Sequence, residues 1–151
     1  VEIIERTKRK KNFKTHNATK IFQALRIFVN KEISELIDGL INATKFLKKG
    51  GKLIVISFHS LEDKIVKFYF SNYSKNKSNV SRYFPKENNE IIFFEDYKNK
   101  IIRPKEREIK KNNASRSAKL RVAIRSQDNF SYPTALKERF LNYLKLENEN
   151  A

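Results

Sequence analysis

Residues 50–63, which read GGKLIVISFHSLED, constrain the fold more than any other stretch of the chain. Gly50 and Gly51 predict the end of a helix, because glycine adopts the left-handed conformation of a helix C-terminus without steric cost. Residues 53–56 form a mostly β-branched apolar run that is too short for a helix. Such a run is typical of a strand buried on both faces of a parallel sheet.

A new helix is predicted directly after this strand. Ser60 and Asp63 have the spacing of a capping box, with a carboxylate in the first turn where the helix dipole favours negative charge. Ser57, His59 and Ser60 then lie at the carboxyl end of a buried strand, where open α/β sheets bind their ligands. The stretch therefore predicts an α/β fold with a doubly wound sheet and a ligand site in this turn.

The region before the strand is strongly helical. Apolar side chains recur every three or four residues over residues 18–49, and a helix of this length favours a break near Asn30. Residues 1–17 are polar and basic, as expected of a linker or of the end of another element. Arg26 interrupts an apolar stretch; it is either a surface arginine whose stem lies on apolar neighbours or a contact to phosphate or substrate.

The second half of the chain predicts loops and short elements. Residues 74–90 predict a loop, in which Arg82, Tyr83 and Phe84 either stack on a base or pack locally. A strand is expected over residues 91–97 and a short basic helix over residues 105–111. A short amphipathic helix is expected over residues 134–146.

Residues 118–125 alternate between apolar and basic side chains, which predicts a half-exposed edge strand. One set is expected to face the core and the other to face solvent: Leu120, Val122 and Ile124 inward, Lys119, Arg121 and Arg125 outward. The outward basic side chains either protect the edge from aggregation or contact phosphates.

The charge of the chain points to a polyanionic partner. There are 33 Lys and Arg residues against 17 Asp and Glu residues, a formal net charge of +16 at pH 7. Nucleic acid is the first inference, although the lysine bias of an AT-rich coding sequence produces the same excess. The chain has no cysteine, which excludes disulfides and thiolate metal sites, and no metal ligand set is expected. No apolar run approaches a membrane span, and a cytoplasmic protein is expected.

Common catalytic motifs are missing from the sequence. With three glycines it has no Gly-rich nucleotide loop, and it has neither a G-x-S-x-G elbow nor an H-E-x-x-H motif. It has no methionine, so Val1 is not expected to be the natural start and the chain is expected to be a fragment.

Three separated blocks carry a family resemblance: residues 18–32 (ATKIFQALRIFVNKE), residues 50–67, and residues 115–121 (SRSAKLR). In this order they resemble the ribosomal RNA small-subunit methyltransferase H family. The phrases ISFHSLED and T-x-x-FQALR are highly specific to it. The resemblance covers roughly residues 14–125 and leaves residues 126–151 unmatched.

The resemblance implies the C-terminal part of a Rossmann-like methyltransferase domain. The family methylates N4 of a cytidine in the decoding region of small-subunit (16S) rRNA and uses S-adenosylmethionine. Its Gly-rich cofactor loop lies in the N-terminal half, so no cofactor residue is expected here and the isolated chain is expected to be inactive. We expect residues 1–17 to be a linker or the end of an inserted helical domain, 18–125 the methyltransferase part, and 126–151 an extension.

The predicted substrate-binding residues form the turn after the strand: Ser57, Phe58, His59 and Ser60. An aromatic ring, two hydroxyls and an imidazole suit a cytosine that is presented out of its stack, and His59 is a candidate for proton transfer. Alternatively, His59 and Ser60 only cap the helix. The predicted rRNA contacts are Arg26, Arg103, Arg116, Lys119 and Arg121.

A second function class stays open beside the enzyme. The chain is either part of an rRNA cytidine-N4 methyltransferase or a non-catalytic basic domain that binds RNA or the ribosome. DNA binding has weak support, because no helix-turn-helix or zinc-finger pattern is present. A Gly-rich loop encoded in frame before Val1 would favour the enzyme.

Overall fold

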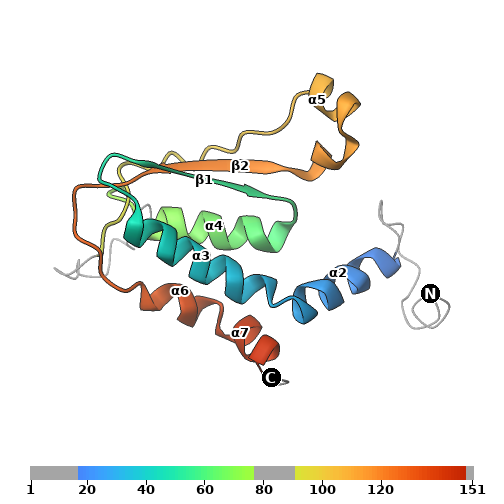
Figure 1. The fold of residues 1–151 in the computed structure, drawn as a ribbon, viewed down its shortest axis with the longest axis horizontal. Helices are drawn as coiled ribbons and strands as arrows, with labels where there is room; N and C mark the ends of the chain where they lie inside the picture. Colours follow the sequence, from blue (N-terminus) through green and yellow to red (C-terminus); the bar gives the residue numbers. More distant parts are fainter. Residues whose placement is uncertain (1–16, 77–90, 149–151) are drawn as a thin grey trace, which may run out of the picture. The chain divides into compact units, whose positions relative to one another are not determined.

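The computed structural model describes residues 17–76 and 91–148 (Figure 1). The chain divides into two compact units, a larger one of residues 36–140 and a smaller one of residues 1–35 and 141–151. The predicted stacking residues Arg82, Tyr83 and Phe84 lie outside the described residues. A search of the described helices for a membrane-crossing segment finds none that is long and apolar enough.

The smaller unit contains α2 (Asn17–Val29), the start of α3 (Glu32–Phe46) and α7 (Leu141–Asn148). The predicted helix break near Asn30 is confirmed, because α2 ends at Val29 and Lys31 adopts a left-handed φ of 51°. Arg26 reaches across the break, where its Nε lies 2.8 Å from Oε1 of Glu32.

A buried carboxylate fastens α7 to the first turn of α3. Glu147 accepts hydrogen bonds from the backbone N–H of Ile33 at 3.0 Å and of Ser34 at 2.9 Å, and from the Ser34 hydroxyl. The first amides of a helix have no partner within the helix, and its dipole favours a negative charge there. Glu147 therefore caps α3 from a distant part of the chain.

The larger unit is built on a two-stranded antiparallel sheet. β1 (Lys52–Ser57) pairs with β2 (Lys119–Ile124), with Val55 opposite Arg121. α4 (Ser60–Asn72) packs on one face of the sheet (Figure 1). Among the described residues of this unit no helix covers the other face, where Ile54 and Ile56 are 56% and 55% exposed. The prediction that this strand is buried on both faces of a parallel sheet is therefore wrong for the described residues.

Aromatic side chains form the core between α4 and residues 91–97. The rings of Tyr69 and Phe70 meet Phe94 edge-to-face, with centroids 5.5 and 5.1 Å apart. Phe93 and Phe94 are both fully buried. Two consecutive inward side chains are incompatible with the alternation of a strand, so the predicted strand over residues 91–97 is reduced to isolated bridges at Phe94.

Two glycines shape the entry into β1. Gly50 has a φ of 79° and its N–H donates to the carbonyl of Arg125 at 2.9 Å. A Cβ on Gly51 would lie 2.7 Å from Cδ1 of Leu47, so only glycine fits without a shift. The helix end predicted at Gly50 and Gly51 lies earlier, because α3 ends at Phe46, four residues before Gly50, and the two glycines instead form the turn into β1.

The short elements that remain lie in the larger unit. The predicted basic helix is confirmed as α5 (Glu106–Lys111), which is followed by the 3-10 helix η1 (Asn113–Ser117). The prediction of a single helix over residues 134–146 is wrong. α6 (Thr134–Arg139) is followed by the buried Phe140 as its C-cap, and α7 begins at the next residue. Lys137 of α6 pairs with Asp38 of α3 at 2.9 Å.

Candidate substrate turn and its basic surroundings

The turn after β1 combines two inward and two outward side chains. Ser57 is buried, and its hydroxyl lies 3.4 Å from the carbonyl of Lys119 on the neighbouring strand. The Phe58 ring is 53% exposed, and Ser60 is exposed as well. His59 lies between them in extended conformation and forms the N-cap of α4. Phe58 and Ser60 are thus the predicted substrate residues that a ligand can reach.

The cap of α4 is built by His59 and Glu62. The N–H of Glu62 donates to Nδ1 of His59 at 3.3 Å, and the Glu62 carboxylate accepts from the N–H of Phe58 at 2.7 Å and of His59 at 3.2 Å. The prediction of a Ser60–Asp63 capping box is therefore wrong by one residue, because the chain enters the helix directly after His59. Hydrogen bonds between the backbone of the turn and the side chains of His59 and Glu62 thus hold the turn against the start of α4.

Both nitrogens of the His59 ring contact Glu62. Nδ1 accepts the helix amide, so the neutral ring carries its proton on Nε2, which lies 3.1 Å from Oε1 of Glu62. The imidazole side chain is only 8% exposed. Capping accounts for these contacts, and proton transfer from a substrate would require Nδ1 to leave the amide.

Asp63 has a structural partner instead of a capping role. Its carboxylate accepts from Nε and Nη2 of Arg121 at 2.8 and 3.3 Å, and from Nζ of Lys119 at 3.2 Å. Burial alone would raise the pKa of Asp63, but the hydrogen bonds and charges of Arg121 and Lys119 outweigh it and hold the pKa below its ordinary value.

The basic side chains of β2 face the core rather than solvent. Arg121 is 2% exposed, and its Nη1 also donates to the Tyr97 hydroxyl at 2.7 Å and to Oδ1 of Asn99 at 2.9 Å. Arg125 is 4% exposed and donates to the carbonyls of Phe93 and Asp128. The predicted alternation of this strand is confirmed, but its orientation is inverted. The reason is that α4 and the loops beneath β2 supply a carboxylate and carbonyl oxygens for the guanidinium groups.

The remaining predicted RNA contacts are spread over several elements. Arg103 and Arg116 are exposed, one before α5 and the other in η1. Arg26 belongs to the smaller unit and pairs with Glu32. Lys119 pairs with Asp63 and keeps about a fifth of its side chain exposed. Arg26 thus lies in one unit, and Arg103, Arg116 and Lys119 lie in the other.

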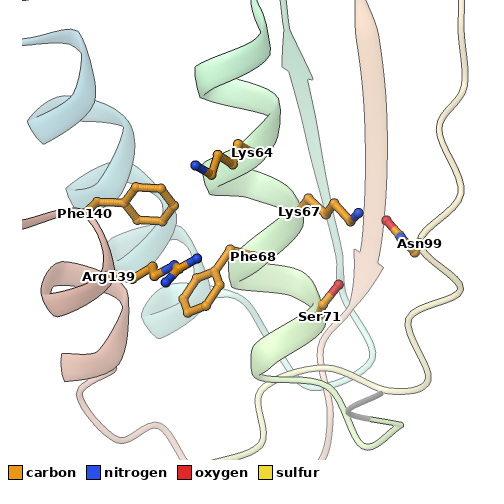
Figure 2. A pocket seen from close by; sticks show the side chains of 7 residues that line it. All are labelled: Lys64, Lys67, Phe68, Ser71, Asn99, Arg139 and Phe140. Carbon is orange, nitrogen blue, oxygen red and sulfur yellow. The ribbon is translucent and has the colours of Figure 1, made fainter. Parts of the chain in front are cut away.

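A basic groove crosses the outward face of α4, and the sequence reasoning missed it (Figure 2). It encloses about 420 Å³. Its lining residues are Lys64, Lys67, Phe68 and Ser71 of α4, together with Asn99, Arg139 and Phe140. The α4 members have helical i, i+3, i+4, i+7 spacing, which is visible in the sequence. The other members come from distant segments, and no local pattern joins them to α4.

Comparison with known proteins shows that this α/β chain belongs to a class of methylases. A model of the MraW methylase family matches residues 1–126. The chain therefore belongs to the MraW methylase family.

Curated relatives carry a more specific name. The ribosomal RNA small subunit methyltransferase H of Agrobacterium fabrum is 44% identical over 126 residues, which cover 83% of this chain and 36% of the relative. The protein of the same name from Bartonella bacilliformis is 49% identical over 120 residues, covering 79% of this chain and 36% of the relative. The chain thus spans about a third of the length of the curated relatives it matches.

Proposed function

We propose that this chain forms the substrate side of a methyltransferase that uses S-adenosylmethionine to methylate N4 of a cytidine in the decoding region of 16S rRNA. The observation that carries the proposal is the exposed Phe58 ring on a strand-end turn that is held by a capping box, in a chain of a methylase family. Ligands of α/β sheets bind at such strand ends.

The turn supplies a surface for a cytosine that has left its base stack. The Phe58 ring offers a flat apolar wall, and a base bound to it is held by stacking. The Ser60 hydroxyl can accept a hydrogen bond from the N4 amino group of the cytosine. This bond would hold the amino group in place, because its lone pair is delocalised into the cytosine ring and makes it a weak nucleophile. Ser57 and His59 position this wall through their contacts with Lys119 and Glu62.

His59 is the candidate for taking the amine proton, and this role competes with its cap. Transfer to Nδ1 would require the Glu62 amide to be released first. A proton could also pass from N4 to water, so the proposal assigns His59 a positioning role and leaves proton transfer to experiment.

The described residues do not fit the methyl donor. Gly39 lies inside α3, and Gly50 and Gly51 shape the turn that precedes β1, so no described glycine follows a strand end where it would cradle a nucleoside. We place the S-adenosylmethionine site in the part of the relatives' length that this chain does not span.

RNA contacts are proposed where basic side chains are available to phosphates. Arg103 and Arg116 have exposed guanidinium groups and are the strongest of the predicted contacts. Arg26 and Lys119 hold carboxylates and retain partial exposure. Arg121 donates to Asp63, Tyr97 and Asn99, so we propose that it supports the strand end and does not contact RNA.

A chimera tests the proposal directly. Residues 1–126 of this chain replace the matching segment of the Agrobacterium fabrum relative, and small-subunit RNA is analysed for N4-methylcytidine by mass spectrometry of its nucleosides. We expect the chimera to methylate and the isolated chain to be inactive. A folded chimera that binds RNA without producing the methylated nucleoside would rule out the proposed reaction.

The second candidate is RNA binding without catalysis, which the net charge of +16 favours. It predicts that the isolated chain binds RNA with strong salt dependence and that the chimera gains no methylation. The same experiment therefore separates the two functions.

A further inference from the structure

We propose that the basic groove on α4 holds the phosphodiester backbone of single-stranded RNA, with one base stacked on Phe68. This inference rests on the proposed function, because it extends the binding surface for the same RNA beyond the turn at residues 57–60. The groove is lined by three cations, Lys64, Lys67 and Arg139, and by no acidic side chain among the described residues (Figure 2).

The polar groups of the groove are matched to an anion. A phosphodiester oxygen only accepts hydrogen bonds, whereas lysine and arginine only donate them. The orientation of Asn99 is also fixed, since its Oδ1 accepts from Nη1 of Arg121 at 2.9 Å. Asn99 and the Ser71 hydroxyl are the uncharged polar members of the groove lining.

An apolar wall distinguishes this groove from a site that would bind only an anion. Phe68 is half-buried and its ring meets the buried Phe140 edge-to-face, with centroids 5.7 Å apart at 84°. Phe140 thus packs against the Phe68 ring, and the part of that ring that stays accessible is where we place the base. Aromatic rings flanked by cations are the usual components of single-strand binding surfaces.

The position of the groove suits an RNA strand that passes the candidate substrate turn. Lys64 lies one helical turn after Ser60, which is about 6 Å along the axis, and Lys67 lies about 10 Å along it. The three cations also have no ion-pair partner within residues 17–76 and 91–148.

The test compares two charge-matched triple variants of the 151-residue chain. Lys64→Gln/Lys67→Gln/Arg139→Gln removes the groove cations, and Lys48→Gln/Lys49→Gln/Lys52→Gln removes three exposed lysines elsewhere in the same unit. Binding of a labelled ten-nucleotide single-stranded RNA is measured from 50 to 200 mM salt. Three lost phosphate contacts should reduce the salt slope by about 2 for the groove variant, and the control should keep the slope of the unaltered chain.

A second variant separates RNA from a free anion. Phe68→Leu should weaken the RNA about fivefold or more and leave binding of a sugar-phosphate strand without bases unchanged. Equal salt slopes of RNA binding in the two triple variants would overturn the assignment of the groove as an RNA site. They would leave RNA binding elsewhere on the chain and methylation by the chimera unaffected. Displacement of the RNA by inorganic phosphate alone, with no effect of Phe68→Leu, would also overturn it. Absence of N4-methylcytidine from the chimera, by contrast, would refute only the proposed reaction.

Discussion

Arg121 of β2 and Asp63 of α4 form a two-point ion pair, with Nε–Oδ1 and Nη2–Oδ2 distances of 2.8 and 3.3 Å. The two residues are 58 positions apart in the chain. Their side chains are 2% and 13% exposed, so the pair joins the sheet to the helix in a place that water barely reaches. It also lies one residue beyond the capping pair of His59 and Glu62, and thereby fixes the base of the candidate substrate turn.

Removing one partner of this pair should destabilise the chain strongly. Asp63→Asn leaves the Arg121 guanidinium buried without its counter-charge, which costs about 3 kcal/mol. Arg121→Met on top of Asp63→Asn should restore part of the loss, since both charges are then gone. Urea unfolding of the two single variants and the double variant measures the coupling; additive losses would show that the pair is energetically silent.

The same pair predicts how stability depends on pH. The pKa of Asp63 is lowered from 3.8 in the folded chain, so the carboxylate contributes stability that is complete above that value and is lost as the pH falls through the folded pKa. The difference in unfolding free energy between the unaltered chain and Asp63→Asn should therefore be constant from pH 5 to 7, as about one unit above the ordinary pKa suffices for full ionisation. It should shrink below about pH 4. A difference that is independent of pH down to pH 2 would contradict this assignment.

The capping carboxylate of Glu147 should control the attachment of α7. Glu147→Gln keeps the shape of the side chain but replaces one charged acceptor oxygen, at an expected cost of about 1–3 kcal/mol. Amide hydrogen exchange should then accelerate at Ile33 and Ser34, whose N–H groups donate to this carboxylate. Glu138→Gln is a matched control, because Glu138 is exposed and should leave both amides protected.

Local patterns in the sequence predicted the elements well where the determining contacts are also local. The helix break near Asn30 and the short helix α5 depend on neighbouring residues, and both are found. The turn at residues 57–60 likewise lies at the predicted strand end. Its cap was misassigned by a single residue, because histidine can accept a helix amide as serine does.

Long-range partners explain the predictions that failed. The alternation of β2 is clear in the sequence, but which of its faces meets a helix depends on Asp63 and on the carbonyl of Phe93. Phe93 and Phe94 look like part of a strand, yet both rings are drawn into one aromatic core. The groove on α4 needs Asn99 and Arg139, which no periodicity connects to that helix.

The uncovered face of the sheet should contribute little to the stability of the isolated chain. Ile56→Thr removes a half-exposed apolar side chain and should change the unfolding free energy by less than about 0.5 kcal/mol. Ile65→Val lies in the core, with no exposed surface, and should cost about 1 kcal/mol although it removes only one methylene. Thermal melts of both variants test this order, and an Ile56→Thr loss equal to that of Ile65→Val would show that this face is covered.

Two substitutions at His59 separate capping from chemistry. Asparagine can accept the Glu62 amide through its side-chain oxygen, so His59→Asn should retain the cap, whereas His59→Ala should lose about 1 kcal/mol of stability. In the chimera with the Agrobacterium fabrum relative, a purely positioning histidine predicts that His59→Asn keeps most of the turnover and His59→Ala does not. A proton-accepting histidine predicts that both variants lose turnover, because asparagine cannot take up the amine proton. The turnover of His59→Asn, in a chimera whose cap is retained, therefore decides between the two roles.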